Sequence, residues 1–440
     1  MVLIFTPRIT SRNKFTFKLI LSDILGLDYE ITNNHEVFTK YIGPKFSYCR
    51  QAIGDEIFFQ STGLLFETGI VVQELQTLEW HGSKVFYLTH KTSILPFDPF
   101  AASFFLVSRY EEYLPHIKDK HGRFAAQQSL AFQQGFLDTP IVNLWALEIL
   151  TILEKSFGPL IRKGLQYSFV STIDIDNAWA YQHKGFIRAG AGLFADASNL
   201  KFKHLWERFL VLFRFKQDPY DTYEYQIELI EKYKLKTIFF FLLGDFATFD
   251  RNVPYQNKHM QSLIKYIADI GEVGIHPSYA SSGSSKKLQQ EVHRLSNILH
   301  QEVQSSRQHF LKLNLPQTYH RLIECDITDD YTMGYAELPG FRASIASSFF
   351  FYDLDLEIET SLKIHPFAVM DGTLKDYMKV DPEKASEIIN PLIDKVKAVH
   401  GTFISIWHNE SFAENDRWKG WRKVYEDLVE KALPNPEHNQ

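Results

Sequence analysis

The sequence predicts an α/β fold over residues 166–440, preceded by a smaller α+β domain. Short apolar runs alternate there with amphipathic segments of helical period. The expected strands cover residues 167–173, 237–243, 272–275, 362–365 and 402–407, and the expected helices cover residues 223–233, 259–270, 287–303, 382–399 and 418–432. Several of these strands are apolar throughout, which is typical of a parallel sheet covered on both faces. In such a sheet or barrel, functional side chains gather at the carboxyl ends of the strands.

The first third of the chain has a different pattern. A short alternating piece at residues 84–89 precedes an aromatic block at residues 97–114, and helical spacing follows over residues 139–157. Glycine and proline after that helix end it, so we expect a domain boundary near Leu165. The first domain, residues 1–165, has no role that the sequence identifies. Its RYEEYL stretch, residues 109–114, carries enough charge and aromatic surface to pack beside the second domain or to recognise substrate.

Composition limits the possible classes of partner. The chain has 47 Lys plus Arg and 53 Asp plus Glu, and its formal net charge of −6 gives no general attraction for nucleic acid or for an anionic membrane. Two distant cysteines, Cys49 and Cys325, cannot form a disulfide framework and suit a reducing compartment. The N-terminus lacks a signal-peptide pattern, and no apolar run approaches the ~20 residues of a membrane span. We therefore expect a cytoplasmic protein that is not inserted in a membrane.

Acids and imidazoles follow the predicted strands. Asp174 and Asp176, in FVSTIDIDNA, are one residue apart, so a strand would place both on one face. His276 follows the run EVGI, and His408 ends the run FISIWH. Taken singly, the acids could cap a helix and each histidine could be a core residue bonded to a carbonyl. Together they are the ingredients of a metal-assisted hydrolase.

Four sequence motifs resemble those of the polysaccharide deacetylase family and occur in the same order. This family has the NodB-homology fold of family 4 carbohydrate esterases. The motifs are STIDID, KYKLKTIFFFLLGD, IADIGEVGIHPS and FISIWHN, and the resemblance covers roughly residues 166–430. It implies a distorted (β/α) barrel and metal-dependent hydrolysis of an N-acetyl group on a carbohydrate or related small substrate. The first domain resembles only an uncharacterised domain that precedes some such deacetylases.

The resemblance also implies roles for single residues. Asp174 would be the general base, His408 the general acid, and Asp176 and His276 ligands of a divalent metal, with zinc expected. Arg307, in SRQHFL, matches the family's arginine motif and would pair with Asp174.

The sequence departs from the family at Ala280. Family members carry a second metal histidine there, four residues after the first. His309, inside the arginine motif, is the nearest replacement and would complete an Asp-His-His site, although it could equally be a surface residue or one that only supports the ligands. His365, at its own strand end, is the other claimant.

Four further side chains are candidates for substrate binding: Tyr279, Tyr331, Arg342 and Trp407. The polar, glycine-rich stretch at residues 329–344 would form a loop that contacts sugar hydroxyls or simply lies on the surface. Trp407 could stack on a pyranose ring or pack internally.

Two other functions remain open from sequence. The D-x-D at Asp174 and Asp176 could belong to a magnesium-dependent phosphatase, with Asp329 and Asp330 as a second acid pair. Alternatively, Ala280 could mark a deacetylase-like module that has lost catalysis and binds carbohydrate or protein. The sugar, the acyl group and the oligomeric state are not identified by the sequence.

Overall fold

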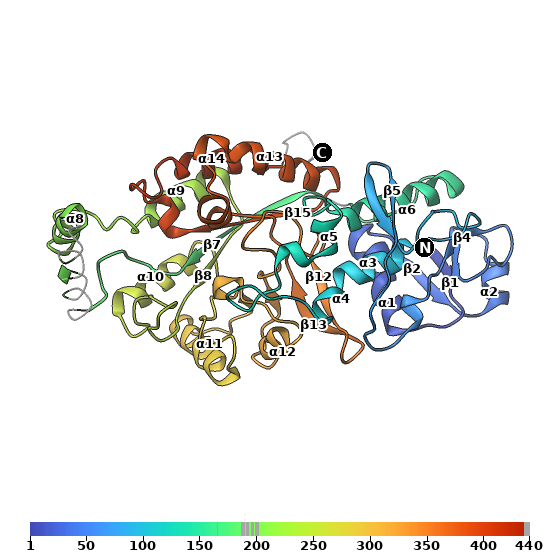
Figure 1. The fold of residues 1–440 in the computed structure, drawn as a ribbon, viewed down its shortest axis with the longest axis horizontal. Helices are drawn as coiled ribbons and strands as arrows, with labels where there is room; N and C mark the ends of the chain where they lie inside the picture. The colour runs from blue at the N-terminus through green and yellow to red at the C-terminus, as the bar shows by residue number, and fades with distance from the viewer. Residues whose placement is uncertain (165, 186–189, 191–192, 195–197, 199–201, 435–440) are drawn as a thin grey trace.

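The computed structural model describes residues 1–164, 166–185, 190, 193–194, 198 and 202–434. The predicted boundary residue Leu165 lies outside these residues. Toward the N-terminus, a parallel sheet has the order β2 (Tyr29–Thr32), β1 (Val2–Phe5), β3 (Lys45–Cys49) and β4 (Ile57–Gln60) (Figure 1). Its strands are too short to show a hydrophobic periodicity in the sequence. In a hairpin of β5 (Thr77–Trp80) and β6 (Ser83–Phe86), β6 overlaps the start of the alternating piece at residues 84–89.

Helices cover the N-terminal sheet and join it to the rest of the molecule. The aromatic block forms α3 (Pro99–Val107), which is buried along its whole length, and α4 (Tyr110–Tyr113). The predicted helix at residues 139–157 is α6 (Ile141–Phe157). The remaining helices of this part are α1 (Ser11–Phe17), α2 (His35–Lys40) and α5 (Leu130–Gln133).

The second sheet contains nine of the described strands and confirms the α/β class. Its order is β12 (Phe349–Asp353), β13 (Ile358–Ile364), β11 (Asp329–Asp330), β10 (Ser305–Ser306), β9 (Glu272–Ile275), β8 (Thr237–Phe241), β7 (Ser168–Ile175), β15 (Thr402–His408) and β14 (Val369–Met370). Every neighbouring pair is parallel except β12 with β13. All five predicted strands are present. The two-residue strands β10, β11 and β14 are too short for a sequence pattern to reveal, and the five-residue strand β12 is also absent from the prediction.

The helices between these strands lie close to their predicted positions. They are α8 (Phe202–Leu212), α9 (Tyr223–Tyr233), α10 (Lys258–Ala268), α11 (Ser285–Leu299), α12 (Gln317–Ile323), α13 (Pro382–Ala398) and α14 (Trp421–Ala432). Of these, α8 and the short α12 were not predicted. No described helix is both long and apolar enough to cross a membrane.

The nine-stranded sheet is strongly curved. Residues 365–368 alone connect β13, near one end of the strand order, to β14 at the other end. Within this connection the Phe367 N–H donates to the Met333 carbonyl (3.1 Å), and the Ala368 N–H donates to the Ile404 carbonyl (2.9 Å). The two ends of the sheet must therefore approach each other, which directs the carboxyl ends of the parallel strands toward one region.

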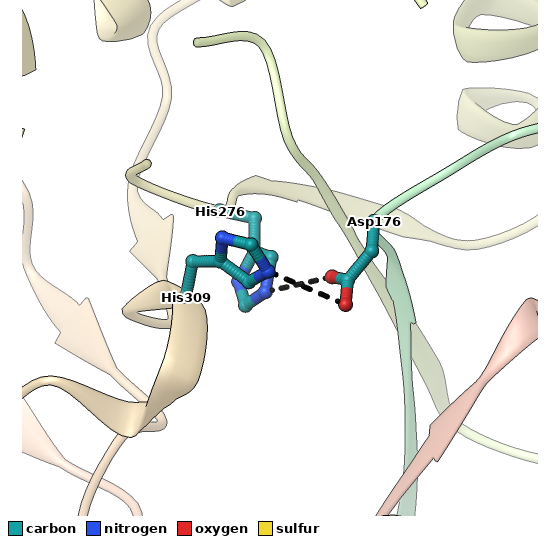
Figure 2. A group of neighbouring side chains, drawn as sticks. All are labelled: Asp176, His276 and His309. Atoms are coloured by element: carbon teal, nitrogen blue, oxygen red, sulfur yellow. Dashed lines mark ion pairs between the residues drawn. The ribbon is translucent and has the colours of Figure 1, made fainter. Parts of the chain in front are cut away.

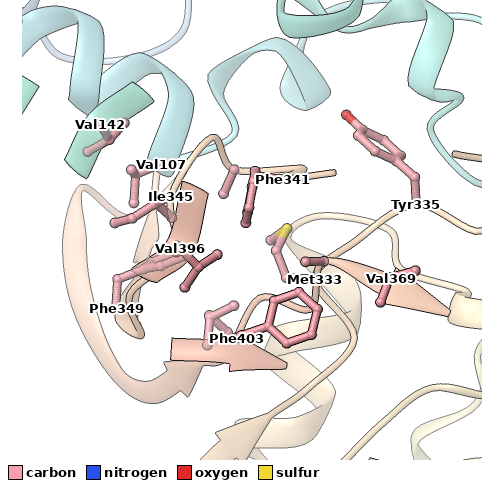
Figure 3. Close-up of a cluster of buried hydrophobic side chains, with 14 of the residues drawn as sticks. Val107, Val142, Met333, Tyr335, Phe341, Ile345, Phe349, Val369, Val396 and Phe403 are labelled. Carbon is pink, nitrogen blue, oxygen red and sulfur yellow. The ribbon is translucent and has the colours of Figure 1, made fainter. Parts of the chain in front are cut away.

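One apolar core runs through both parts of the chain. Val107 of α3 and Val142 of α6 belong to the same buried cluster as Ile345, Phe349 and Phe403 of the second part (Figure 3). Burial of this apolar surface makes the main contribution to the free energy that holds the two parts together.

A buried charge network crosses the same junction. The Glu112 carboxylate accepts from Arg109 Nε (2.8 Å) and from Arg342 Nη2 (2.6 Å), and the Arg109 guanidinium also donates to Tyr335 Oη (3.2 Å). Burial alone would raise the pKa of Glu112, but Arg342 and Arg109 outweigh it and lower that pKa to about 2. RYEEYL therefore serves packing between the two parts.

Glu112→Gln should destabilise the protein by about 3–5 kcal/mol, because two buried guanidinium groups lose their shared counter-charge. Urea denaturation measures the change. Glu36→Gln is the matched control, since Glu36 forms an exposed i,i+4 pair with Lys40 and should cost no more than about 0.5 kcal/mol. Equal effects of the two substitutions would contradict a stabilising role for the network.

The stability gap between wild type and Glu112→Gln should also depend on pH. The pKa of Glu112 is lower in the folded protein, about 2, than in an unfolded chain, about 4.3. The contribution is therefore complete above the unfolded value and is lost as the pH falls toward the folded value. Denaturation midpoints should differ most near neutral pH and converge toward pH about 2; a gap that widens on acidification would contradict the assignment.

Candidate metal and catalytic site

Three side chains from different strand ends meet at one point. Asp176 follows β7, His276 follows β9, and His309 lies just beyond β10. Asp176 Oδ1 is 3.1 Å from His276 Nε2, and Asp176 Oδ2 is 3.4 Å from His309 Nε2 (Figure 2). Among the described residues these three form the group whose ligand atoms all lie within 4.8 Å of one another.

The hydrogen bonds of the two imidazoles determine which nitrogen faces the group. His276 Nδ1 lies 2.5 Å from the Arg307 carbonyl, which can only accept, so Nδ1 carries the proton. His309 Nδ1 lies 2.9 Å from Asp250 Oδ1, which likewise accepts. Both Nε2 atoms therefore present lone pairs toward Asp176 in the neutral tautomers, as in metal-binding histidines.

One buried acceptor of this group has no hydrogen-bond partner. Asp176 Oδ1 is buried and has no hydrogen-bond donor, although His276 Nε2 is close by. Two acceptors at that distance repel each other unless a cation or proton lies between them. A divalent metal of the type bound by nitrogen and oxygen ligands fits this donor set.

The electrostatics of the site favour the same conclusion. Burial opposes ionisation of Asp176, but the imidazoles of His309, His276 and His408 outweigh it and hold the pKa of Asp176 well below its usual range. Burial also opposes charge on His309, yet Asp176 and Asp250 raise the pKa of His309 to about 9. The carboxylates therefore stabilise a cation at this position.

Asp250 shows how the site accommodates Ala280. Its carboxylate accepts from the backbone N–H groups of Tyr279 (2.8 Å) and Ala280 (3.2 Å) while it binds His309. The loop at Ala280 thus anchors an aspartate that also orients His309. No pattern in FDRN, residues 249–252, distinguished Asp250 in the sequence.

Asp174 lies beside this group and is held by Arg307. Arg307 Nη1 donates to Asp174 Oδ1 at 2.9 Å and to Thr172 Oγ1 at 2.6 Å, and all three side chains are buried. The second carboxylate oxygen, Asp174 Oδ2, lies 3.8 Å from His276 Nε2. Arg307 therefore leaves Oδ2 directed toward the candidate metal position.

His408 stands next to Asp174 on the adjacent strand, since the two are register partners of β15 and β7. His408 Nε2 is 3.8 Å from Asp176 Oδ2, and His408 Nδ1 is 2.7 Å from Asp371 Oδ1. Burial opposes the charged imidazole, but Asp371 and then Asp176 raise the pKa of His408 well above its usual value. Asp371 was missed in the sequence, although it directly follows the short apolar run of β14.

A cavity of about 230 Å³ joins these residues. Its wall includes Asp174, Asp176, His276, His309 and His408, together with Arg123, Phe310, Met370, Tyr377, Glu410, Arg417 and Trp418. The volume is below the ~300–1,000 Å³ typical of sites for drug-sized ligands. It suits one small ring or acyl group.

The N-terminal part of the chain contributes to this cavity through Arg123. Its guanidinium donates to the Phe310 carbonyl (2.7 Å), to Tyr377 Oη (3.3 Å) and to Asp119 Oδ2 (2.7 Å). Arg123 therefore ties the loop that bears His309 to the opposite wall.

Three of the expected substrate contacts lie elsewhere. Trp407 is fully buried in the apolar core, Tyr331 is buried with its ring stacked on His365, and Arg342 is buried against Glu112. Residues 329–344 are mostly buried, which corrects the expectation of an exposed loop. Tyr279 is half-buried and packs edge-on against Phe310, itself part of the cavity wall.

The alternative metal ligand His365 and the second acid pair, Asp329 and Asp330, also lie outside the cavity. His365 Nε2 binds Asp329 Oδ1 at 2.7 Å, and Asp330 accepts from Ser306 and Thr332. A second acid pair for phosphatase chemistry is therefore not brought to Asp174 and Asp176.

One family model matches the N-terminal part of the chain. Residues 2–158 match DUF7033, a family of unknown function. No curated protein matches the sequence.

The chain is also similar to solved deacetylase-type structures over 61–63% of its length. A protein provisionally described as a polysaccharide deacetylase from Mycobacterium smegmatis is 15% identical, with 61% of this chain and 85% of that chain covered and a TM-score of 0.40. A CE4 family pseudoenzyme from Bacillus anthracis (14%, 63% and 66%, 0.30) and a polysaccharide deacetylase from Bacillus cereus (12%, 62% and 94%, 0.30) are also similar. Identities this low leave the chemistry to be judged from the side chains themselves.

His309→Ala should reduce zinc affinity by at least about 100-fold, because it removes one of three converging ligand atoms. Isothermal titration with a competing chelator measures the affinity. His365→Ala is the matched control and should bind zinc as wild type does, since His365 lies outside the cavity. Unchanged affinity in His309→Ala would exclude it as a ligand.

Proposed function

We propose that the protein is a metal-dependent hydrolase of an N-acyl, in the first instance N-acetyl, group on a carbohydrate or related small substrate. The observation that carries the proposal is the convergence of acceptor atoms from Asp176, His276 and His309 between Asp174 and His408. A non-catalytic binding module needs no such set of an acid and a base on either side of a cation site. Zinc is the proposed metal, because one carboxylate and two imidazoles are ligands that it prefers.

Asp176, His276 and His309 would hold the metal, which when bound supplies an electrophile for the acyl oxygen and lowers the pKa of an attacking water. Asp174 would act as the general base. The pairing of its Oδ1 with Arg307 fixes the carboxylate and leaves Oδ2 to accept the proton of the attacking water.

His408 would act as the general acid. Its raised pKa keeps the imidazolium populated at neutral pH, and Asp371 accepts the Nδ1 proton, so Nε2–H remains to be donated to the departing amine. The 2.7 Å contact with Asp371 also holds the ring in place, because this buried carboxylate is itself fixed by the backbone N–H of His408 (2.8 Å) and by Ser411 Oγ. Proton acceptance and donation then occur on adjacent strands.

The size of the cavity supports a single sugar ring or a small N-acyl amide as the bound group. Arg417, which pairs with Glu410 (3.4 Å) and Asp376 (3.0 Å), and Arg123 supply polar atoms along the wall. The curved sheet further supports a distorted (β/α) barrel, and the change of sheet near residue 165 supports a boundary between residues 1–165 and 166–440.

Asp174→Asn and His408→Ala should each lower turnover by about 10²–10⁴-fold while zinc stays bound, since a base or acid can be lost without loss of the ligands. Acetate released from a panel of N-acetylated mono- and oligosaccharides measures turnover, and elemental analysis measures zinc. Asp176→Ala should lose both. Asp329→Asn, outside the cavity, is the control and should retain both.

Two results would contradict the proposal. Full activity of Asp174→Asn would remove the assigned base. Wild-type protein that holds no metal, releases no acetate and still binds the glycans would instead identify a binding module.

A further inference from the structure

The helix α8 presents aromatic side chains to solvent. It lies in the segment between β7 and α9 and projects away from both sheets, at the left of Figure 1. Phe202, Trp206, Phe209 and Phe213 have exposed fractions of 66%, 62%, 39% and 61%. Their spacing of four, three and four residues places them on one side of the helix. Trp206 stacks on Phe209, with ring centroids 5.6 Å apart, and Phe209 contacts Phe213 at 4.4 Å. We call these four residues the aromatic stripe.

The opposite side of α8 faces the protein. Val211 is fully buried, Tyr181 Oη donates to Glu207 (3.4 Å), and the Arg208 guanidinium lies 4.7 Å from the Tyr181 ring centroid. A helix on the surface of a soluble protein normally buries its apolar side and exposes its polar side. In α8 the side that carries Glu207 and Arg208 contacts the protein, and the side that carries the aromatic stripe faces solvent. An exposed apolar face of this kind indicates that an apolar partner covers the aromatic stripe.

The charge around the stripe favours an anionic surface. Residues 202–217 contain four basic residues, Lys203, Arg208, Arg214 and Lys216, and one acidic residue, Glu207, which gives a net charge of +3 in a chain whose net charge is −6. Lys203 and Lys216 form ion pairs with Asp416 and Glu207, but these lysines are exposed and such pairs are weak in water. Phe and Trp flanked by Lys and Arg are typical of helices that lie in a membrane interface.

The position of α8 relates it to the cavity. Lys203 Nζ lies 2.5 Å from Asp416 Oδ2, and the next two residues, Arg417 and Trp418, line the cavity. The segment that carries α8 begins directly after Asp176 and returns at Thr222, whose hydroxyl donates to the Asn409 carbonyl. A surface bound by α8 would therefore lie beside the candidate site.

We propose that α8 binds the surface of a lipid bilayer that contains anionic lipids, with the aromatic stripe in the interface and the helix parallel to the membrane plane. Eleven residues of helix span about 17 Å, which is much shorter than the ~30 Å hydrocarbon core, so α8 does not cross the bilayer. The inference does not depend on the hydrolase proposal, because it rests on the exposed face of α8 alone.

Flotation of the full chain with vesicles tests the proposal. Wild type should float with vesicles of phosphatidylcholine and phosphatidylglycerol, should float less with phosphatidylcholine alone, and should be released by high salt. The variant Trp206→Gln/Phe209→Gln/Phe213→Gln should partition at least about tenfold more weakly. The matched control Ile42→Gln/Val72→Gln/Ile161→Gln replaces three exposed apolar residues elsewhere and should bind as wild type does.

Thermal denaturation and zinc affinity of the aromatic variant should match wild type, which separates loss of lipid binding from misfolding. Absence of flotation in wild type, or equal flotation of the aromatic variant, would overturn the proposal. So would sedimentation equilibrium that shows a wild-type dimer and a monomeric aromatic variant without vesicle binding, because the stripe would then be covered by a second copy of the chain.

Discussion

Arg307 connects the two chemical parts of the candidate site. Its side chain binds Asp174 Oδ1, and its backbone carbonyl accepts the Nδ1 proton of His276. The same residue thus orients the proposed base and selects the tautomer of a proposed ligand. His309, two positions further along, lies in the same segment, with its Nε2 3.4 Å from Asp176 Oδ2.

Residues of the strands β8 and β9 hold the Arg307 side chain in position. The Phe240 ring of β8 lies 4.6 Å from the Arg307 guanidinium, and Gly274 of β9 leaves room for that ring, because a Cβ at position 274 would lie 2.6 Å from Phe240 Cε1. The buried strand β8 and the buried residues 169–175 of β7 exclude water around the pair of Asp174 and Arg307, which strengthens their interaction. Arg123 adds a contact from the N-terminal part, so the shared core and the Glu112 network act indirectly on the shape of the cavity.

Much of the candidate site could be predicted because strand ends are visible in the sequence. Asp174, Asp176, His276 and His408 each follow an apolar run, and parallel strands bring such positions to one edge. Asp250 and Asp371 could not be found in this way, because one lies in an irregular loop and the other follows a strand of only two residues. The prediction was wrong in the opposite way for three residues, Trp407, Tyr331 and Arg342, which do not belong to the candidate site. Aromatic and charged residues near a site suggested sugar contacts, yet burial and a partner such as Glu112 place these side chains inside the protein.

We propose that Asp176, His276 and His309 bind one divalent metal. X-ray absorption spectroscopy of the zinc-loaded protein tests it most directly, because it reports ligand type and distance without dependence on a substrate. We expect a first shell of nitrogen and oxygen at about 2.0–2.2 Å, with outer-shell scattering from two imidazoles that falls to one in His309→Ala. A shell that contains sulfur, or imidazole scattering that does not change in this variant, would contradict it.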